Sequence, residues 1–476
     1  MIADLKPYSA YKDSGVSWLG EIPTHWRVER AKWLFRKMNR PVLDSDDVVT
    51  CFRDGVVTLR KNRRVRGFTE SLKEIGYQGI RRGDLVIHAM DAFAGAIGVS
   101  DSDGKGSPVY SVCQPNKEVD SHYYAYAVRE MARRQWILAL ATGIRERSTD
   151  FRFAAFASQQ VPLPRPDEQH AIVRYLDYMD RRIRRYIRAK QKLIALLEEQ
   201  KQAIIHQAVT RGLAPNVRLK PSGVEWLGDV PEHWSEVTVG QIAESLQTGP
   251  FGSQLHASDY VEGGIPVINP LHLRGGKICA DSKFAVSQDT VARLSRHKLE
   301  LDDVVIGRRG EMGRCGLVGA EEVGWLCGTG SMRLRPKPGF FDPKYLLLLL
   351  TSKRVGEFLS LVSVGATMEN LNPSIVSRVR LPCPPVAEQQ RIIALVNDLT
   401  SHVEHAIKRA EREIALLREY RTRLIADVVT GQVDVRAAAA QLPDETELDQ
   451  IVNEEEAQNN GEEELELAEE GEEIYE

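Results

Sequence analysis

The most regular feature of the chain is a pair of long segments in which apolar residues return after alternating steps of three and four. The first runs from Glu168 to about Val209, and the second keeps the same register 220 positions later. Because the repeat continues for about six heptads without a proline, it is typical of a coiled-coil seam. Each segment predicts a helix of about 42 residues, roughly 60 Å long at about 1.5 Å per residue. The predicted seam positions are Ile172, Leu176, Met179, Ile183, Ile187, Ile194, Leu197, Ile204 and Ala208, followed by Ile392, Val396, Leu399, Val403, Ile407, Ile414, Leu417, Leu424 and Val428.

A single helix of this kind cannot bury its own seam. It could pair with its copy, with another chain, or with a second molecule. The matching register favours pairing of the two copies within one chain, and the order of the segments favours an antiparallel arrangement. We therefore expect a rigid spacer with one globular module at each end.

The segments around the helices are a duplication. Residues 14–26 read SGVSWLGEIPTHW and residues 222–234 read SGVEWLGDVPEHW, and these copies contain four of the seven tryptophans. The proline-rich entries to the long helices also repeat: Pro162, Pro164, Glu168 and Gln169 recur as Pro382, Pro384, Glu388 and Gln389. The chain therefore consists of two modules of one fold.

The middles of the modules, residues 27–160 and 235–380, diverge almost completely and mix short strand-like runs with glycine turns. The runs DLVIH at 84–88 and DVVI at 303–306 predict corresponding strands. A weaker echo is an aspartate at a helix start with a tyrosine three residues later, as in Asp120 and Tyr123, and again in Asp342 and Tyr345. Because the ends of the two modules repeat while their central sequences differ, we expect each module to recognise something different.

The predicted fold class is α+β, with two α/β recognition modules joined by two long antiparallel coiled-coil helices and a pseudo-twofold internal duplication. The expected domains are residues 1–165, 166–213, 214–385, 386–435 and 436–476, which are module, helix, module, helix and tail.

Charge is distributed unevenly. The net charge is −4, but residues 437–476 contain sixteen Asp and Glu and no Lys or Arg, so the rest of the chain carries +12. The basic charge of residues 1–436 suits a polyanionic partner. The acidic end, residues 437–476, is equally well explained as a segment that merely aids solubility. The start lacks the apolar core of a secretory signal, and six cysteines without CxxC spacing indicate neither a zinc site nor disulfides. We therefore expect a cytoplasmic protein.

Two groups of residues are candidate DNA contacts, with an ordinary solvated surface loop as the alternative reading for the arginine clusters. Arginine matches the two acceptors of guanine in the major groove, and polar side chains and lysine can also contact phosphates. In the first module the candidates are Arg60, Lys61, Arg63, Arg64, Arg66, Arg145 and Arg147. In the second they are Thr248, Phe251, Ser253 and Gln254 of the glycine-rich loop LQTGPFGSQL, with Arg308, Arg309 and Arg314.

Catalytic motifs are missing from the sequence. It contains neither a Gly-rich methyl-donor loop paired with NPPY or DPPY, nor a Walker motif, nor a GxSxG turn. His402 and His405 lie three residues apart, but arginines occupy the matching positions of the first helix, so we expect no metal site.

The doubled SGVxWLGxxPxHW openings, the PxPxxxEQ helix entries, the IALLxE helices and the TGxFGSxL loop resemble the specificity subunit of type I restriction-modification systems. The resemblance covers roughly residues 8–435. It implies two target recognition domains that each read half of a split double-stranded DNA sequence, with the helices fixing the gap. The TGxFGS loop is absent from the first module, so its role cannot be transferred there.

The resemblance also implies partners. Two methyltransferase (modification) subunits would bind the helices and bring S-adenosylmethionine, and restriction subunits would bring ATP and magnesium. The chain itself would bind no cofactor and catalyse nothing. The competing hypotheses are a protein-only scaffold, which would lack salt-sensitive DNA affinity, and a self-contained nuclease or methyltransferase, which the missing motifs disfavour.

Overall fold

A computed structural model describes residues 5–63, 75–116, 118–140, 150–212, 216–224, 226–251, 253–310, 313–363 and 371–443. The chain divides into two compact units, Met1–Arg188 with Ile414–Glu476 and Ala189–Glu413. Each unit contains one module and a half of each long helix. Among the described residues, no helix is both long and apolar enough to cross a membrane.

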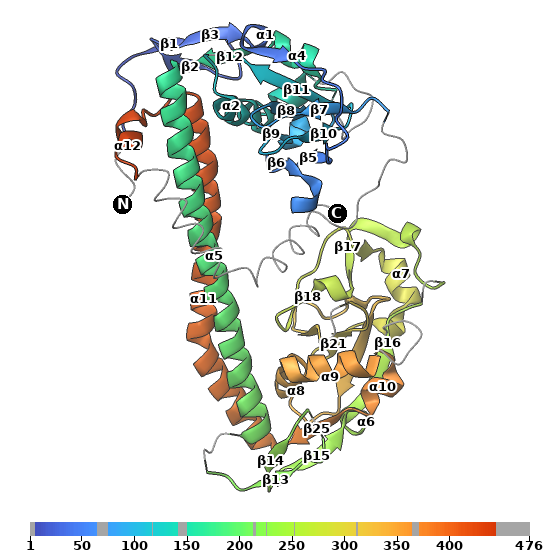
Figure 1. The fold of residues 1–476 in the computed structure, drawn as a ribbon. Coiled ribbons are helices and arrows are strands. Elements are labelled where there is room, and N and C mark those ends of the chain that lie inside the picture. Colours follow the sequence, from blue (N-terminus) through green and yellow to red (C-terminus); the bar gives the residue numbers. More distant parts are fainter. Residues whose placement is uncertain are drawn as a thin grey trace. The chain divides into compact units, whose positions relative to one another are not determined.

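Two long helices, α5 (Pro166–Arg211) and α11 (Val386–Val429), match the two predicted segments (Figure 1). In the first unit, Arg421 of α11 forms an ion pair with Asp180 of α5. In the second unit, Lys190 pairs with Glu413 at 2.6 Å and Lys201 pairs with Glu404 at 3.0 Å. Since residue numbers rise along one helix as they fall along the other, the pairing is antiparallel, and the predicted coiled coil within one chain is confirmed.

Most of the predicted seam is buried, including Ile172 and Val428 in the first unit and Ile392 and Val396 in the second. Leu399 is an exception, because 46% of its surface is exposed. The neighbouring Thr400 is buried instead, and its hydroxyl donates to the Val396 carbonyl oxygen at 2.8 Å. A side chain that returns a hydrogen bond to its own helix can take a seam position that the apolar pattern assigned to leucine.

Module 1 comprises the elements from β1 to β12 and lies in the first unit. Its strands are β1 (Tyr11–Asp13), β2 (Glu21–Pro23), β3 (Arg27–Arg30), β4 (Phe35–Lys37), β5 (Val49–Cys51), β6 (Val57–Leu59), β7 (Gln78–Ile80), β8 (Leu85–His88), β9 (Ile97–Val99), β10 (Gly104–Gly106), β11 (Tyr110–Pro115) and β12 (Gln160–Leu163). Its helices are α1 (Ala31–Leu34), α2 (Ser121–Arg133), α3 (Trp136–Ala139) and α4 (Phe153–Ser158), with 3-10 turns η1 (Arg60–Asn62) and η2 (Ala92–Ala94).

Module 2 comprises the elements from β13 to β25 and lies in the second unit. Its strands are β13 (Leu219–Pro221), β14 (Asp229–Pro231), β15 (Ser235–Thr238), β16 (Ala243–Thr248), β17 (Tyr260–Ile268), β18 (Leu273–Arg274), β19 (Lys277–Ile278), β20 (Ala285–Val286), β21 (Val304–Gly307), β22 (Cys315–Leu317), β23 (Leu326–Cys327), β24 (Ser331–Pro336) and β25 (Arg380–Cys383). Its helices are α6 (Val239–Ile242), α7 (Gln288–Arg293), α8 (Pro343–Leu350), α9 (Lys353–Ser363) and α10 (Pro373–Ser377), with 3-10 turns η3 (Ala257–Asp259), η4 (Pro270–His272) and η5 (Ser295–His297). A last helix, α12 (Arg436–Ala440), follows α11 in the first unit.

The two modules share one sheet topology. The antiparallel order is β4-β11-β8-β9 in module 1 and β16-β24-β21-β22 in module 2, and a second pair, β3 with β12 or β15 with β25, leads into the long helix. The central strands β8 and β21 are the predicted runs, and they are apolar and buried on both faces except at the half-buried His88 that ends β8. Behind each sheet a helix begins at the predicted aspartate, whose carboxylate caps it: Asp120 accepts from the His122 N–H and Asp342 from the Lys344 N–H.

Candidate nucleic-acid interface

In each module a buried glutamine near the start of the long helix, Gln169 or Gln389, makes the same hydrogen bonds to the module. We call this contact between a module and its long helix the joint. The Gln169 amide accepts a hydrogen bond from the Asp120 N–H at 2.9 Å and donates to the Pro164 carbonyl at 3.0 Å. In module 2 the Gln389 amide accepts from the Asp342 N–H at 2.8 Å and donates to the Pro384 carbonyl at 2.9 Å. In each module one glutamine side chain thus connects the start of the long helix to the aspartate that caps α2 or α8. Because α2 and α8 pack against the sheets, this connection also fixes the position of each sheet.

The glutamate before each glutamine binds the histidine of the tryptophan signature. Glu168 is fully buried and lies 3.0 Å from His25 Nε2, and it also accepts a 2.6 Å hydrogen bond from the Tyr8 hydroxyl. Burial, together with this bond, raises the pKa of Tyr8 far above its usual range. In module 2, Glu388 lies 2.9 Å from His233 Nε2. The repeated sequence signature is therefore a structural joint.

Each joint also receives the end of the opposite long helix. The Tyr123 hydroxyl donates to the carbonyl of Val429 at the end of α11, at 3.0 Å, and Tyr345 donates to Val209 near the end of α5, at 3.4 Å. A glycine with positive φ follows each helix and packs against the signature tryptophan: Gly431 has a φ of 77° and Gly212 a φ of 73°. Only glycine adopts this turn without strain, so the chain leaves both helices close to the tryptophan.

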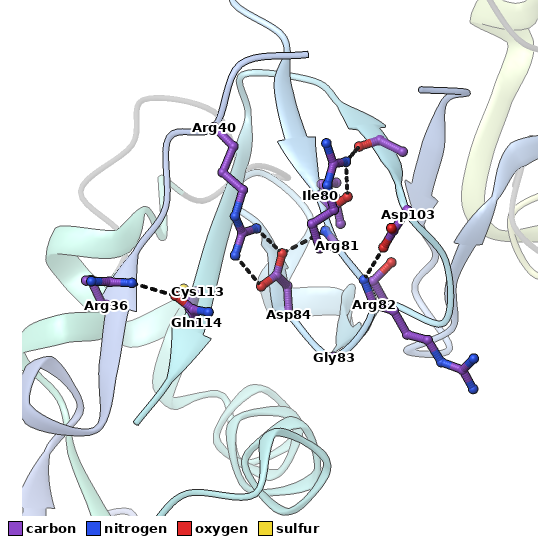
Figure 2. A network of polar contacts seen from close by, with 12 residues as sticks. Arg36, Arg40, Ile80, Arg81, Arg82, Gly83, Asp84, Asp103, Cys113 and Gln114 are labelled. Carbon is purple, nitrogen blue, oxygen red and sulfur yellow. Dashed lines mark hydrogen bonds and ion pairs between the residues drawn. The ribbon is translucent and has the colours of Figure 1, made fainter. Parts of the chain in front are cut away.

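The turn between β7 and β8 in module 1 is organised around Asp84, the aspartate that precedes β8 (Figure 2). Asp84 is buried, and its carboxylate receives both terminal nitrogens of Arg40 and the backbone N–H of Arg81, the last at 2.8 Å. The Arg81 guanidinium in turn pairs with Asp46 at 3.0 Å. The network holds the turn between β7 and β8 and uses both of these arginines inside the module.

Two other arginines near this network are exposed. Arg36 on the edge strand β4 donates to Gln114 at 2.7 Å, and Arg82 binds Asp103 only through its backbone N–H. Figure 2 shows the Arg82 side chain pointing away from the ion pairs. A guanidinium on a fixed turn with its head toward solvent is suited to contact a phosphate or a base edge. Sequence reasoning missed both residues, because each belongs only to a pair of basic residues, Arg36 with Lys37 and Arg82 with Arg81, and not to a longer cluster.

The predicted basic cluster of module 1 is largely engaged within the module. Lys61 forms a 2.5 Å ion pair with Asp47, and Arg63 forms one of 2.6 Å with Asp54 while its guanidinium stacks over the Phe52 ring. Lys61 and its partner are both mostly exposed, so this pair can exchange for a phosphate at little cost. The Arg60 side chain bonds Thr50 at 3.3 Å. The remaining candidates, Arg64, Arg66, Arg145 and Arg147, lie outside the described residues.

The glycine-rich loop of module 2 follows the edge strand β16, which ends at Thr248. The loop is braced from within: the Phe251 N–H donates to the Gln254 side chain at 3.1 Å, and Arg293 donates to the Gln254 carbonyl at 2.6 Å. Phe251 is 60% exposed and Ser253 is exposed too. The bracing presents an aromatic ring and a hydroxyl to solvent on a held loop, while Gln254 is used to build it. Arg293 and the exposed Arg296 beside it are further residues that sequence reasoning missed.

The arginines after β21 have different roles. Arg308 is buried, and its guanidinium donates to the Leu371 carbonyl at 2.7 Å. Burial, with a contribution from Arg309, lowers the pKa of Arg308. We therefore correct the sequence interpretation of Arg308, because a guanidinium enclosed in the module is not presented to a duplex. Arg309 is exposed, whereas Arg314 is half-buried and its carbonyl pairs with the Gly307 N–H.

Module 2 also has a buried aspartate before its central strand. Asp303 accepts from Arg335 Nε at 2.8 Å and from the Glu300 N–H at 2.7 Å, and Arg333 lies 3.9 Å away. The backbone bond repeats that of Asp84, but the arginine partner comes from β24 rather than from beyond the edge strand. Both modules therefore have a buried aspartate at this position, but the arginine that neutralises it comes from a different place in each module.

The described residues contain no group of three or more His, Cys, Asp or Glu placed to hold a metal ion. Burial raises the pKa of the Cys315 and Cys327 thiols to about 12, so neither is a thiolate at neutral pH. The groups gathered on the two sheet faces are instead guanidinium, amide and aromatic groups. These groups suit recognition of a polyanion.

Both modules have one sheet topology and are fixed to the antiparallel helix pair, and each presents its own exposed polar side chains. Residues 231–412 match the family model described as "Type I restriction modification DNA specificity domain". This range, which spans most of module 2 and part of α11, is similar to that domain, and the curated relatives described next are specificity subunits of type I restriction enzymes.

Curated relatives and one solved structure agree. The EcoBI specificity subunit of Escherichia coli is 21% identical over 277 residues, which are 57% of this chain but only 58% of that subunit. The MjaVIII specificity subunit of Methanocaldococcus jannaschii is 21% identical over 365 residues, covering 75% of this chain and 80% of that one. A chain from a structure described as "Structural basis underlying complex assembly and conformational transition of the type I R-M system" superposes with a TM-score of 0.59 at 16% identity, covering 86% of this chain and 98% of the other. This superposition establishes a shared fold.

Proposed function

We propose that this chain is the DNA-reading subunit of a type I restriction-modification complex, in which each module reads one half of a bipartite target and the paired helices fix the gap. The observation that carries the proposal is that both modules use one sheet and one joint, yet present different side chains. A protein that reads two unrelated half-sites in one orientation needs this combination.

Different residues would then have different tasks in the complex. Exposed cations such as Arg36, Arg82 and Lys61 in module 1, and Arg296 and Arg309 in module 2, would contact phosphates and set register. Residues on held loops would read base edges or the thymine methyl group, Phe251 and Ser253 among them. Thr248 and Gln254 stay candidate contacts through their loop, as do Arg60, Arg63 and Arg314 if their present partners release them.

The chemistry would be supplied by partners. Two methyltransferase subunits would bind the helix pair with S-adenosylmethionine, and restriction subunits with ATP and magnesium would complete the cleaving assembly. This chain would contribute no catalytic group and hold no cofactor of its own. Its part is to hold two recognition surfaces at joints in which Glu168, Gln169 and Gln389 are buried and Glu388 is half-buried.

The test is to co-express the chain with its neighbouring methyltransferase subunit and to map methylated adenines in the host DNA by long-read sequencing. We expect a split motif with a fixed gap that disappears when this chain is omitted. Exchange of residues 27–160 for those of another specificity subunit should change one half-site and leave the other. Methylation without a split motif, or a change in both half-sites, would contradict the proposal. Methyl transfer or cleavage by the purified chain alone would also contradict it.

A further inference from the structure

Helix α5 has a basic stretch that the joints do not require, and most of this stretch lies in the first unit. Residues 181–192 of α5 read RRIRRYIRAKQK, with seven Lys or Arg and no Asp or Glu, whereas the matching stretch of α11, residues 401–412, reads SHVEHAIKRAER. Both helices form the same seam and the same joints. The positive charge of α5 therefore serves something that α11 does not share.

Within this stretch the arginines line up along one side of the helix. Arg174, Arg181, Arg185 and Arg188 follow one another at spacings of seven, four and three residues, which keeps them on one face. The last three are exposed. At about 1.5 Å per residue this arginine row extends for roughly 20 Å.

A groove runs beside the arginine row. It is lined by four tyrosines, Tyr175, Tyr178, Tyr186 and Tyr420, together with Arg182 of α5 and Leu442 after α12. The guanidinium of Arg182 lies over the rings of Tyr178 and Tyr186, 5.7 and 5.9 Å from their centroids. Tyr186 is 51% exposed. The groove therefore offers aromatic surface for apolar side chains, next to a row of positive charge for carboxylates.

The described part of the chain ends at the beginning of this row. Arg174 Nη2 donates to the carbonyl oxygens of both Leu442 and Pro443, each at 3.0 Å. The next residues, 444–456, read DETELDQIVNEEE, and four of the first six are acidic. Six extended residues span about 20 Å, so carboxylates that start at Arg174 reach the full length of the row. Leu448, Ile451 and Val452 supply apolar side chains among these acids.

We propose that residues 444–456 occupy the tyrosine groove of their own chain, with Leu448, Ile451 and Val452 against the tyrosines and the acidic side chains along Arg181, Arg185 and Arg188. Because the segment is tethered at Arg174, its local concentration is in the millimolar range, and even weak individual contacts keep the site filled. A filled groove hides the arginine row from other polyanions, including DNA outside the target. The acidic end is thus an intramolecular competitor.

A labelled peptide with the sequence of residues 444–456 tests the site, with binding followed by fluorescence anisotropy. We expect it to bind a chain truncated after Pro443 at least about tenfold more tightly than the full chain, where the tethered segment competes. Reversal of Arg181, Arg185 and Arg188 to Glu should abolish binding to the truncated chain. The matched control reverses three exposed cations of α11, Arg391, Lys408 and Arg412, and should leave the affinity unchanged. Equal affinity for the full and truncated chains, or no loss on reversal of the arginine row, would overturn the proposal.

A second measurement uses the full chain and does not depend on truncation. A photo-crosslinking amino acid in place of Tyr186 should react within the chain, and mass spectrometry should place the crosslink in residues 444–456. Crosslinks to other parts of the chain, or to a co-expressed methyltransferase subunit in their place, would assign the groove to a different occupant and overturn the proposal. Neither measurement uses target DNA, so failure of the proposed DNA-reading function would leave both results interpretable.

Discussion

Module 1 and module 2 agree where they meet the helices and differ where they face solvent. Glu168 and Gln169 repeat as Glu388 and Gln389, and the contacts that both joints share differ by a tenth of an ångström, although the Tyr8 hydroxyl bonds only Glu168. The sheet faces instead share little beyond the aspartate before the central strand. The same scaffold thus tolerates replacement of the whole exposed face, because the residues that hold the module are gathered behind the sheet.

The aspartate before the central strand shows how such replacement is possible. Asp84 and Asp303 keep the backbone hydrogen bond that shapes the turn into the strand. The arginine that neutralises the carboxylate comes from beyond β4 in module 1 and from β24 in module 2. Burial of the carboxylate requires a counter-charge, but any strand within reach can provide it. A recognition surface can therefore change its arginines without loss of its scaffold.

The equivalence of the joints predicts equal and large effects from truncating the signature tryptophans. Trp26 and Trp234 are 0% and 1% exposed, so Trp26→Ala and Trp234→Ala should each cost about 3–5 kcal/mol of local stability. Amide hydrogen exchange in the affected module would measure the loss. Trp33→Ala is the control, since this side chain is 64% exposed and should have little effect on stability. A large loss in one module only would break the equivalence.

The buried aspartates before the central strands, Asp84 and Asp303, predict a smaller loss of stability that differs between the two modules. Asp303→Asn and Asp84→Asn keep the side-chain shape but remove the charge from a buried carboxylate, and each should cost about 2–3 kcal/mol. We expect the larger loss in module 2, since Asp303 faces both Arg335 and Arg333. Hydrogen exchange at β8 and β21 would measure both changes. Asp47→Asn, whose pair with Lys61 is exposed to solvent, should leave the stability of module 1 nearly unchanged; a cost as large as that of the buried aspartates would contradict this account.

Acid should destabilise module 2 more than module 1. Burial lowers the pKa of His272 and of His297, and both rings accept hydrogen bonds, from the Asn269 N–H at 3.1 Å and from Arg296 Nε at 3.0 Å. The unfolded chain therefore binds more protons than the folded module, so the stability that is present above about pH 6.5 is lost as the pH falls from there through the lowered folded pKa values. In module 1, burial also lowers the pKa of His88, but there it acts on one such histidine rather than on two. Limited proteolysis between pH 5 and 8 should release module 2 first, and His272→Gln should reduce the difference; earlier release of module 1 would contradict the assignment.

The smallest expected effects are single phosphate contacts. If Arg82 in module 1 and Arg309 in module 2 each contact one phosphate, replacement by alanine should reduce the slope of log affinity against log salt by about 0.9 each. Filter binding to a duplex that carries the methylated motif would measure the slopes. Arg409→Ala, an 83% exposed residue of α11, should not change the slope. A change for Arg409→Ala equal to that for Arg82→Ala would show that general charge, not the module face, sets the slope.

Much of the fold could be predicted because its largest elements carry periodic signals. The seams placed the long helices to within a few residues of Pro166–Arg211 and Val386–Val429, and the apolar runs located β8 and β21. Leu399 was misassigned because a leucine and a seam threonine one residue later fit the same alternation. The duplicated ends predicted two modules of one fold, and in the structure their repeated Glu, Gln, His and Trp residues form the joints.

The recognition faces were less predictable for a physical reason. Basic runs draw attention in a sequence, but a run such as residues 60–66 also contains residues that are paired locally, as Lys61 and Arg63 are. The exposed arginines that the structure adds, Arg36 and Arg82, each have only one basic neighbour in the sequence, Lys37 and Arg81. Burial of Arg308 depends on Leu371, which is 63 positions away. Exposure of a charged side chain is decided by such distant contacts, and periodicity does not report them.

The turn after each long helix has a topological consequence. Residues 434 and 6 pair as a bridge beside Gly431, and Tyr11 donates to the Gln432 carbonyl at 2.9 Å. At the corresponding place in the second unit, Gly212 is joined to module 2 by the continuous polypeptide, where the first unit has the non-covalent contact between residues 434 and 6. The connectivity is therefore that of a ring opened at one of two equivalent points. Moving the opening from one point to the other would exchange the order of the two modules along the chain while leaving every joint intact.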